Sequence, residues 1–411
     1  MFLFALAFVS LAQKDWPQYA GPSGDRTSME VVSAFPRSGP KKTWEVPLEG
    51  GFSSFVVAGS RVYTLITREK RETLVALERD SGREVWSAAL STPEYDGGAD
   101  AGAEGNEGGD GPRSTPSVAD GCVVASDANL VLHAFEAASG KPLWKHALLD
   151  EFAGRNITWQ NAASPLIEGE RVFVAGGGQG QALLAFELKT GALQWARGDE
   201  QMTHATPIAA TLHGVRQVIF FVQKGLVAVD PGTGRELWRT EFPYRTSSAA
   251  SPVVSGDVVY CSAGYGVGAA AWRVTRAGEA FTPELLWREA NKLINHWSTP
   301  VVQDGFLYGM FSFKEYGKGP LKCVELATGK ERWARDGFGP GNCILVGNTL
   351  VALSDAGELV LVAAEPAAYR ELSRSDVLDG KCWSTPAFSA GALYVRSTQE
   401  GVRLELRPKG Q

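Results

Sequence analysis

The chain has 411 residues, and its 40 Lys and Arg against 46 Asp and Glu give a net charge of −6 at pH 7. A protein that binds nucleic acid through phosphate contacts needs a basic surface, so this balance argues against a nucleic-acid partner. Apolar residues make up 44% of the chain, which excludes a disordered protein, and the 47 Gly, 21 Pro and 12 Trp favour an all-β fold.

The first element in the chain is an apolar run from Phe2 to Ala12. It is too short to span a hydrocarbon core of about 30 Å, and the small residues Ser10 and Ala12 precede Gln13, so we predict a signal peptide over residues 1–12. No later segment is long and apolar enough to cross a membrane. We therefore expect the mature protein to be exported, periplasmic or extracellular, and soluble.

A repeated motif follows, in which an acidic residue, a Gly and a Trp are spaced four residues apart. Its five copies are Glu78, Gly82 and Trp86; Glu136, Gly140 and Trp144; Glu187, Gly191 and Trp195; Asp230, Gly234 and Trp238; and Glu325, Gly329 and Trp333. A recurring unit of this length indicates a repeat architecture. We expect the acid to accept backbone N–H bonds, the Gly to adopt a positive φ, and the indole to fill the seam between adjacent sheets.

A second signature, a Ser/Thr-Pro pair before a β-branched run, lies upstream of these motifs. It occurs at Thr115-Pro116, Ser164-Pro165, Thr206-Pro207, Ser251-Pro252, Thr299-Pro300 and Thr385-Pro386, with degenerate copies near Ser54 and Asn342. Pro is tolerated at the first residue of a strand, and a following Gly marks a hairpin. The two signatures together predict eight units of four short antiparallel strands, which is an eight-bladed β-propeller.

The two ends of the chain are expected to close the ring within one blade. The last unit has no fourth strand, while residues 42–46 resemble a fourth strand that lacks the preceding three. Joining them removes two exposed sheet edges, so we predict a single propeller domain over residues 13–411. Residues 96–111 form an acidic, Gly-rich insertion, for which we consider a solvated loop, a lid over the channel or a weak calcium loop.

The five cysteines are Cys122, Cys261, Cys323, Cys343 and Cys382. Their wide spacing is neither a disulfide framework nor a CxxC metal motif, so we expect buried thiols. An alternative in an oxidising compartment is one bridge, between Cys343 and Cys382.

The Ala-x-acid-x-x-Thr-Gly-x-x-x-Trp pattern resembles the tryptophan-docking signature of the PQQ-like repeat propellers. That group includes quinoprotein alcohol dehydrogenases and the outer-membrane-protein assembly factor BamB. The opening Asp15-Trp16-Pro17-Gln18-Tyr19 and Gly109 to Arg113 are similar to exported members. For a working dehydrogenase, the resemblance implies PQQ, a calcium ion held by carboxylate and amide oxygens, an Asp base and usually a vicinal Cys pair. The sequence has no Cys-Cys pair and no CxxCH haem motif.

Residues just before each Ser/Thr-Pro pair should face one mouth of the central channel. The candidate binding residues are Arg113, Trp159, Gln160, Asn161, His204, Arg245, His296, Trp297, Asn342, Lys381 and Trp383. Cations, amides and aromatic rings with few carboxylates suit an anionic or flat ligand. Alternatively, these residues bond the strand starts and the channel is filled with water.

Three functions are compatible with the sequence. The first is a non-catalytic exported scaffold that binds another envelope or secreted protein, with no catalytic or metal-binding residues. The second is a PQQ-dependent alcohol or sugar dehydrogenase that uses PQQ with calcium. The third is a small-molecule or glycan binding module that uses Trp159, Trp297 and Trp383.

Overall fold

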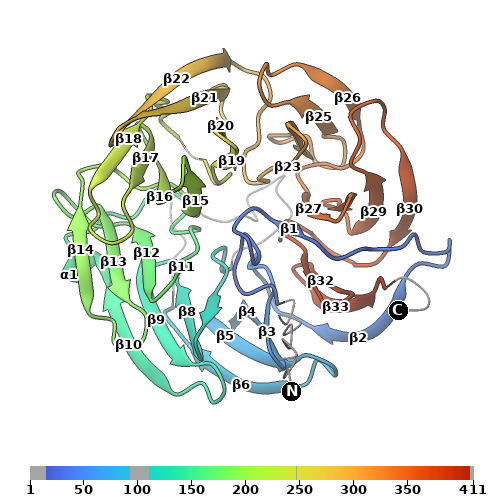
Figure 1. The fold of residues 1–411 in the computed structure, drawn as a ribbon. Coiled ribbons are helices and arrows are strands. Elements are labelled where there is room, and N and C mark those ends of the chain that lie inside the picture. Colours follow the sequence, from blue (N-terminus) through green and yellow to red (C-terminus); the bar gives the residue numbers. More distant parts are fainter. Residues whose placement is uncertain (1–14, 93–110, 247, 408–411) are drawn as a thin grey trace, which may run out of the picture.

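The computed structural model describes residues 15–92, 111–246 and 248–407, and it arranges eight antiparallel sheets in a ring (Figure 1). Each sheet has four strands, and one of them carries an additional short strand. The predicted eight-bladed β-propeller is therefore confirmed. The predicted signal peptide and nearly all of the acidic insertion lie outside the described residues.

The blades follow the chain, and within blades 1 to 7 the strands run in order from the channel to the outer rim. Blades 1 and 2 comprise β3 (Val56–Ala58), β4 (Arg61–Arg68), β5 (Arg71–Glu78) and β6 (Glu84–Ala89), then β7 (Ser117–Ala119), β8 (Cys122–Ser126), β9 (Val131–Glu136) and β10 (Pro142–Ala147). Blades 3 and 4 comprise β11 (Leu166–Glu168), β12 (Arg171–Ala175), β13 (Leu183–Glu187) and β14 (Leu193–Arg197), then β15 (Ile208–Leu212), β16 (Val215–Val222), β17 (Gly225–Val229) and β18 (Glu236–Arg239).

The second half of the chain continues the same pattern. Blades 5 and 6 comprise β19 (Val253–Ser255), β20 (Val258–Ala263), β21 (Gly268–Ala277) and β22 (Ala280–Glu289), then β23 (Val301–Gln303), β24 (Phe306–Met310), β25 (Leu321–Glu325) and β26 (Glu331–Arg335). Blade 7 comprises β27 (Asn342–Val346), β28 (Thr349–Leu353), β29 (Glu358–Ala363) and β30 (Glu371–Asp376). The one helix of the described chain, α1 (Leu148–Glu151), has four residues, so no helix there could cross a membrane.

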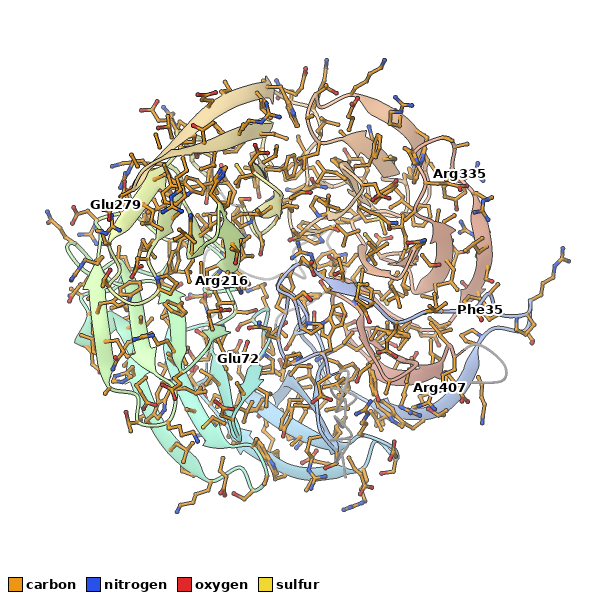
Figure 2. All side chains as sticks on the ribbon, viewed as in Figure 1. Phe35, Glu72, Arg216, Glu279, Arg335 and Arg407 are labelled. Carbon is orange, nitrogen blue, oxygen red and sulfur yellow. The ribbon has the colours of Figure 1, made fainter. Side chains whose placement is uncertain are left out.

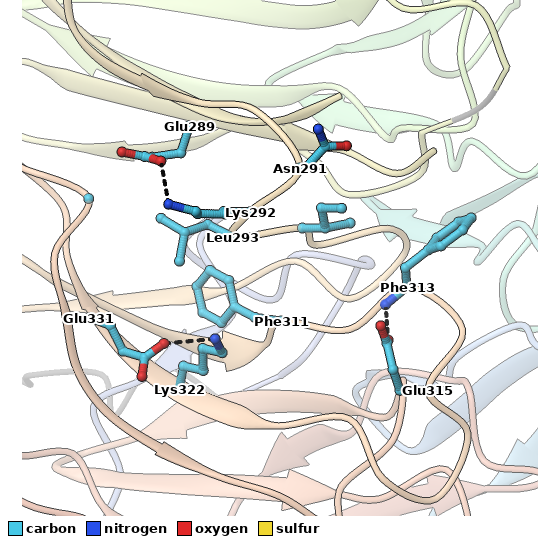
Figure 3. A pocket seen from close by; sticks show the side chains of 11 residues that line it. Glu289, Asn291, Lys292, Leu293, Phe311, Phe313, Glu315, Lys322 and Glu331 are labelled. Carbon is cyan, nitrogen blue, oxygen red and sulfur yellow. Dashed lines mark hydrogen bonds and ion pairs between the residues drawn. The ribbon is translucent and has the colours of Figure 1, made fainter. Parts of the chain in front are cut away.

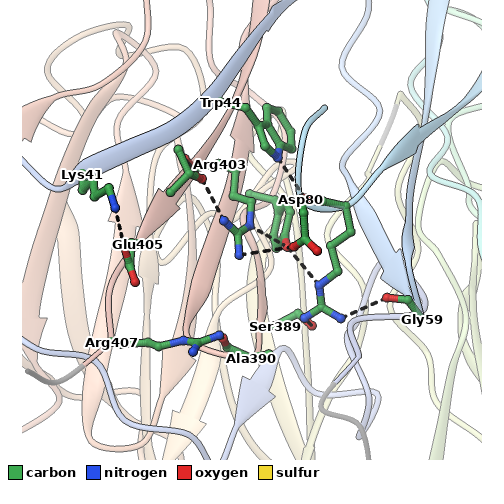
Figure 4. A network of polar contacts seen from close by, with 12 residues as sticks. Lys41, Trp44, Gly59, Asp80, Ser389, Ala390, Arg403, Glu405 and Arg407 are labelled. Atoms are coloured by element: carbon green, nitrogen blue, oxygen red, sulfur yellow. Dashed lines mark hydrogen bonds and ion pairs between the residues drawn. The ribbon is translucent and has the colours of Figure 1, made fainter. Parts of the chain in front are cut away.

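Blade 8 is built from both ends of the chain, as predicted. β31 (Ala387–Ser389), β32 (Ala392–Arg396) and β33 (Glu400–Glu405) come from the C-terminus, and β2 (Lys41–Pro47) pairs antiparallel with β33 as the outer strand. Polar contacts then join blade 8 to blade 1 (Figure 4). The Arg79 guanidinium donates to the Tyr394 hydroxyl at 3.2 Å and to Ser389 Oγ at 2.9 Å.

The core lies in the seams between neighbouring sheets, where side chains fill the space (Figure 2). The indole of Trp86 covers Gly140 of the next blade so closely that a Cβ there would lie 2.6 Å from the ring. Its Nε1 donates to the carbonyl of Ala137 at 3.1 Å. The same bond to a carbonyl of the next blade is made by Trp44, Trp144, Trp195, Trp287 and Trp333, which confirms the seam prediction.

Trp238 departs from this pattern. Its Nε1 donates at 2.7 Å to Gln217 Oε1 of its own blade. The next blade has a long β21–β22 hairpin and no Ser/Thr-Gly turn to receive the indole, and the buried ring packs instead in a cluster with Phe242 and Trp272.

The Ser/Thr-Pro pairs have a role that the sequence did not reveal, because their hydroxyls link successive blades. Thr115 Oγ1 accepts the backbone N–H of Ser54 at 2.9 Å, and Ser164 Oγ accepts that of Thr115 at 2.9 Å. Ser54 Oγ in turn accepts the N–H of Thr385, at 2.8 Å. These bonds hold the starts of neighbouring inner strands together, and the last one joins blade 8 to blade 1.

The N-terminal segment, residues 15–30, runs inside the ring along the inner strands (Figure 1). Trp16 forms a bridge with Val57 of β3, and the Pro17 carbonyl accepts the N–H of Val118 in β7 at 2.8 Å. The segment then adds β1 (Thr27–Ser28) in parallel to β27 of blade 7. The channel thus contains protein chain.

All five cysteines are buried and free, so the bridge considered between Cys343 and Cys382 is not formed. Burial raises the pKa of the Cys343 thiol to about 12 and, together with the nearby Asp355 carboxylate, raises that of Cys382 to about 12. Both thiols are therefore protonated at neutral pH and are poor nucleophiles.

Candidate functional site

The mouth is the face of the propeller on which the eight inner strands begin. Because the second strand of each blade returns to that face, the loops after β20, β24 and β28 also lie there. The predicted site residues occupy the links into the inner strands, with Asn342 at the first residue of β27. The structure thus places them all around one opening, and it adds residues from the three loops.

Aromatic rings dominate this opening. Trp383 stacks on Phe52 with centroids 4.9 Å apart and on Tyr316 at 5.9 Å, and it lies 5.0 Å from Trp297. These separations are typical of attractive ring pairs. The rings come from the links into blades 1, 6 and 8 and from the β24–β25 loop. Together they form one group of contacting rings on one side of the mouth.

His296 connects this group to the rings on the other side. Its ring lies 5.0 Å from Trp297, 5.3 Å from Tyr265 and 4.9 Å from Phe313. Tyr265, in the β20–β21 loop, stacks on Trp159 at 6.1 Å with an interplanar angle of 15°. We call this continuous set of rings the aromatic mouth; it comprises Phe52, Trp159, Tyr265, His296, Trp297, Phe313, Tyr316 and Trp383.

Trp159 reaches its position through an unusual backbone. Trp159 and Gln160 have φ values of 69° and 59°, in the left-handed region that costs a non-glycine residue about 1 to 2 kcal/mol. The Arg113 guanidinium donates at 2.8 Å to the Trp159 carbonyl and fixes this turn. Such strain persists only where the surroundings enforce it, and it is common at binding sites.

The two histidines of the mouth are neutral at neutral pH. Burial, helped by the charge of Arg113, lowers the pKa of His204 to about 4. Burial, His204 and Lys314 together lower the pKa of His296 to about 3. Among the described residues, His296 Nδ1 and Trp383 Nε1 are buried with no hydrogen-bond partner.

Cations flank the rings. Lys381 Nζ lies 5.6 Å from the Tyr316 centroid and 5.9 Å from that of Trp383, while Lys314 Nζ lies 5.6 Å from the centroid of Tyr265. Cation–π contacts of this length are attractive. Lys314 is exposed, whereas the side chain of Lys381 is 13% exposed. Arg245, on the link into blade 5, is exposed.

The amides of the predicted site have a different role. Asn161 is buried, and its Nδ2 donates to Ser126 Oγ at 3.0 Å while its Oδ1 accepts the N–H of Ala163 at 3.1 Å. Asn342 Nδ2 donates to the Trp383 carbonyl at 2.6 Å. The side chains of these two residues therefore hydrogen-bond the chain near the strand starts, as the alternative interpretation of the site expects.

Sequence reasoning missed two carboxylates near the mouth, Asp355 and Glu315. Asp355 accepts the N–H of Gly317 at 3.1 Å and pairs with Lys381 at 3.7 Å, and burial raises its pKa. Glu315 Oε2 accepts the Ser312 hydroxyl at 2.7 Å and the N–H of Phe313 at 2.6 Å. Both follow the second strand of a repeat, so counting loops as well as strand starts could have found them.

These groups do not fit the calcium-bound quinone that the resemblance implies. Calcium takes six to eight oxygen ligands, usually including several carboxylates. Over the described ranges, no group of three or more His, Cys, Asp or Glu residues could hold a metal ion. The two mouth carboxylates are already engaged by backbone N–H groups, a hydroxyl and Lys381.

A separate pocket of about 380 Å³ lies between blades 5 and 6 (Figure 3). Phe311 and Leu293 give it an apolar lining, and Phe313 is shared with the aromatic mouth. Two ion pairs border it: Glu289 with Lys292 at 3.5 Å, and Lys322 with Glu331 at 2.7 Å. Its charged groups are thus largely paired with one another.

Comparison with known proteins shows the family of the chain. The family model of the outer membrane protein assembly factor BamB matches residues 28–98 and 97–335. The chain belongs to the BamB family. The outer membrane protein assembly factor BamB of Shewanella oneidensis is 24% identical over 239 residues, which is 54% of this chain and 56% of that protein. The chain thus spans about half the length of the curated relative that it matches.

Solved structures share the fold of this BamB-family chain. The quinohemoprotein alcohol dehydrogenase from Comamonas testosteroni superposes with a TM-score of 0.70 at 12% identity, covering 97% of this chain and 81% of its own. The quinohemoprotein alcohol dehydrogenase ADHIIG from Pseudomonas putida HK5 does so with a TM-score of 0.66 at 13% identity, with the same coverages. At such identities the likeness establishes the propeller fold alone.

Proposed function

We propose that the protein is an exported, non-catalytic interaction scaffold of the cell envelope that binds a partner protein on the aromatic mouth. The observation that carries this proposal is the continuous cluster of rings, of which six remain partly exposed: Trp159, Tyr265, Trp297, Phe313, Tyr316 and Trp383. Trp and Tyr are the residues that most often dominate the binding energy of protein interfaces.

The surroundings of the rings make them suitable for binding. Each ring already packs on neighbours, so little side-chain freedom is lost when a partner docks. The exposed Lys314 at the rim favours a partner surface that combines acidic with apolar or aromatic side chains. The name of the Shewanella relative, an outer membrane protein assembly factor, and the predicted signal peptide support a place in the envelope.

Binding by mouth variants tests the proposal. We expect Tyr265→Ala and Lys314→Ala to weaken capture of the partner from a periplasmic extract at least tenfold, the scale of about 1.4 kcal/mol at an interface. Leu285→Ala is the matched control, because Leu285 is 57% exposed on the outer strand β22. Undiminished capture by both mouth variants, or an equal loss in the control, would contradict docking at the mouth.

A second candidate, a PQQ-dependent dehydrogenase, is favoured only by the shared fold and the cations of the mouth. Adding PQQ and calcium and measuring dye reduction with a panel of alcohols distinguishes the candidates. Turnover would contradict a non-catalytic scaffold. Saturable binding of PQQ without turnover would instead favour the small-molecule binding module.

A further inference from the structure

The pocket between blades 5 and 6 is lined by a carboxylate that no cation of the described chain neutralises. This carboxylate belongs to Glu315, in the β24–β25 loop. Over the described ranges, the ion pairs of the protein do not include Glu315. Its neighbour Lys314 is directed elsewhere, because Lys314 Nζ lies 5.6 Å from the centroid of Tyr265 and 5.3 Å from that of Phe313.

The Glu315 carboxylate is held in place through one of its two oxygens. Oε2 accepts the Ser312 hydroxyl at 2.7 Å and the backbone N–H groups of Phe313 and Lys314 at 2.6 and 3.1 Å. Burial opposes ionisation, but these hydrogen bonds outweigh it and lower the pKa of Glu315. The group is therefore ionised at neutral pH, and Oε1 accepts no hydrogen bond from the described residues.

The rest of the pocket combines apolar surface with paired charges. Figure 3 shows Phe311 and Leu293 between Glu315 and the two ion pairs that border the pocket. Phe311 is buried, whereas Leu293 and Ile294 are half-buried and offer apolar surface to a ligand. The volume of about 380 Å³ is near the lower end of the range of about 300–1,000 Å³ for ligand pockets, so it suits a small molecule or one side chain.

The charges of the lining favour a cation. The lining contains two lysines and three glutamates, so its formal charge is 2 − 3 = −1. Each lysine is paired with one glutamate, Lys292 with Glu289 and Lys322 with Glu331. The excess negative charge therefore belongs to Glu315, and it attracts positively charged ligands to this part of the pocket.

Among cations, an ammonium group fits Glu315 best. Calcium or magnesium would need several oxygen ligands, and here one carboxylate oxygen is available beside an apolar surface. A guanidinium pairs most strongly with both oxygens of a carboxylate, but Oε2 is already occupied. An ammonium is a compact point charge that can donate to Oε1 alone.

We propose that this pocket binds a primary ammonium group carried on a small apolar body. The ammonium donates to Glu315 Oε1, and the apolar body lies on Phe311 and Leu293. A free amine and the side chain of a lysine share this chemistry. The inference does not rest on the partner proposed for the mouth, and its failure would leave that proposal standing.

Titration calorimetry with a matched pair of small molecules tests the site in the whole protein. The probes are n-pentylamine and 1-pentanol, which have the same apolar stem and differ in the charged group. At pH 7 and constant ionic strength, we expect saturable binding of the amine and at least tenfold weaker binding of the alcohol, because the alcohol lacks the hydrogen bond between charged groups. Equal affinities, or no saturable binding of the amine, would overturn the proposal.

A charge-removing variant locates the binding. Glu315→Gln keeps an oxygen for Ser312 and the backbone N–H groups but removes the negative charge, so we expect at least tenfold weaker binding of n-pentylamine. Glu279→Gln is the matched control, because Glu279 is exposed at the tip of the β21–β22 hairpin, away from the pocket lining (Figure 2). Binding to Glu315→Gln as tight as to the wild type would contradict the site.

A third ligand distinguishes the two sources of the ammonium. Nα-acetyl-lysinamide has the stem and the charge of a lysine in a polypeptide. Tighter binding of this compound than of n-pentylamine indicates a lysine side chain as the natural ligand, and the reverse indicates a free amine.

Crystallography covers the case in which Glu315→Gln does not fold. Wild-type crystals would be soaked in 4-bromobenzylamine, whose bromine gives an anomalous signal. We expect a bromine peak in the pocket beside Phe311, with the ammonium group at Glu315. Bromine peaks only at other places on the protein would overturn the proposal.

Discussion

Replacing Trp44 by alanine tests whether β2 holds the propeller closed. The indole is 7% exposed, lies 6.1 Å from Phe55 and 6.0 Å from Tyr394, and donates to the Arg79 carbonyl at 2.9 Å. It also covers Gly82, where a Cβ would lie 3.0 Å from the ring. Its truncation therefore opens the seam between blades 8 and 1.

The magnitude follows from these contacts. Removing a buried Trp side chain costs about 3 to 5 kcal/mol, of which the indole hydrogen bond contributes about 1 kcal/mol. Trp44→Phe keeps a ring in the seam but leaves the Arg79 carbonyl unpaired, so we expect a loss of about 1 to 2 kcal/mol. Whole-protein stabilities are about 5 to 15 kcal/mol, so the alanine variant should lose a large part of its stability.

Urea unfolding followed by far-ultraviolet circular dichroism measures both variants. Leu193→Ala is the control, because Leu193 is 47% exposed on β14 and such surface changes stay within about 0.5 kcal/mol. Deleting residues 40–48 should destabilise the whole ring for the same reason. An unfolding midpoint of Trp44→Ala equal to that of the wild type would refute closure through β2.

Three further outcomes are expected. The pKa values of about 4 for His204 and about 3 for His296 lie below the unfolded value of about 6.5, so the unfolded chain binds more protons and the free energy of unfolding should fall as the pH drops below about 6.5. Each histidine contributes about 1.4 kcal/mol per pH unit to this fall. Between pH 6 and 5, the free energy of unfolding of His296→Phe, measured in urea, should therefore fall by about that much less than that of the wild type. The same pH dependence in both proteins would refute the assignment. Gly140→Ala should destabilise by more than about 2 kcal/mol in urea, because it adds a clash with Trp86 to a positive φ, whereas Gly121→Ala, with a similar φ and open space, should lose only about 1 kcal/mol; equal losses would contradict the seam. Arg396→Met should lower the free energy of unfolding measured in urea by at least about 3 kcal/mol, because it leaves buried carbonyls unpaired, and a variant as stable as the wild type would show that these contacts are dispensable.

The candidate site was predicted only in part, and the reason lies in which residues the repeat marks. Trp159, His296 and Trp383 precede Ser/Thr-Pro pairs, so their place at one opening could be counted from the sequence. Tyr265 and Tyr316 lie in loops whose lengths differ between blades. Only the folded ring shows that these loops bend over the mouth and bring their rings onto Trp159 and Trp383.

The sequence by itself determined the eight blades, their seams and the closing strand, because each depends on residues at fixed spacing within a unit. The Gly of the next blade that the Trp86 ring covers stands at the same position in every copy of the motif. Only the tertiary structure decided that residues 15–30 enter the channel and that Arg26 is buried there with unused donors. Those contacts join residues hundreds of positions apart, and they exist only once the ring has closed around the segment.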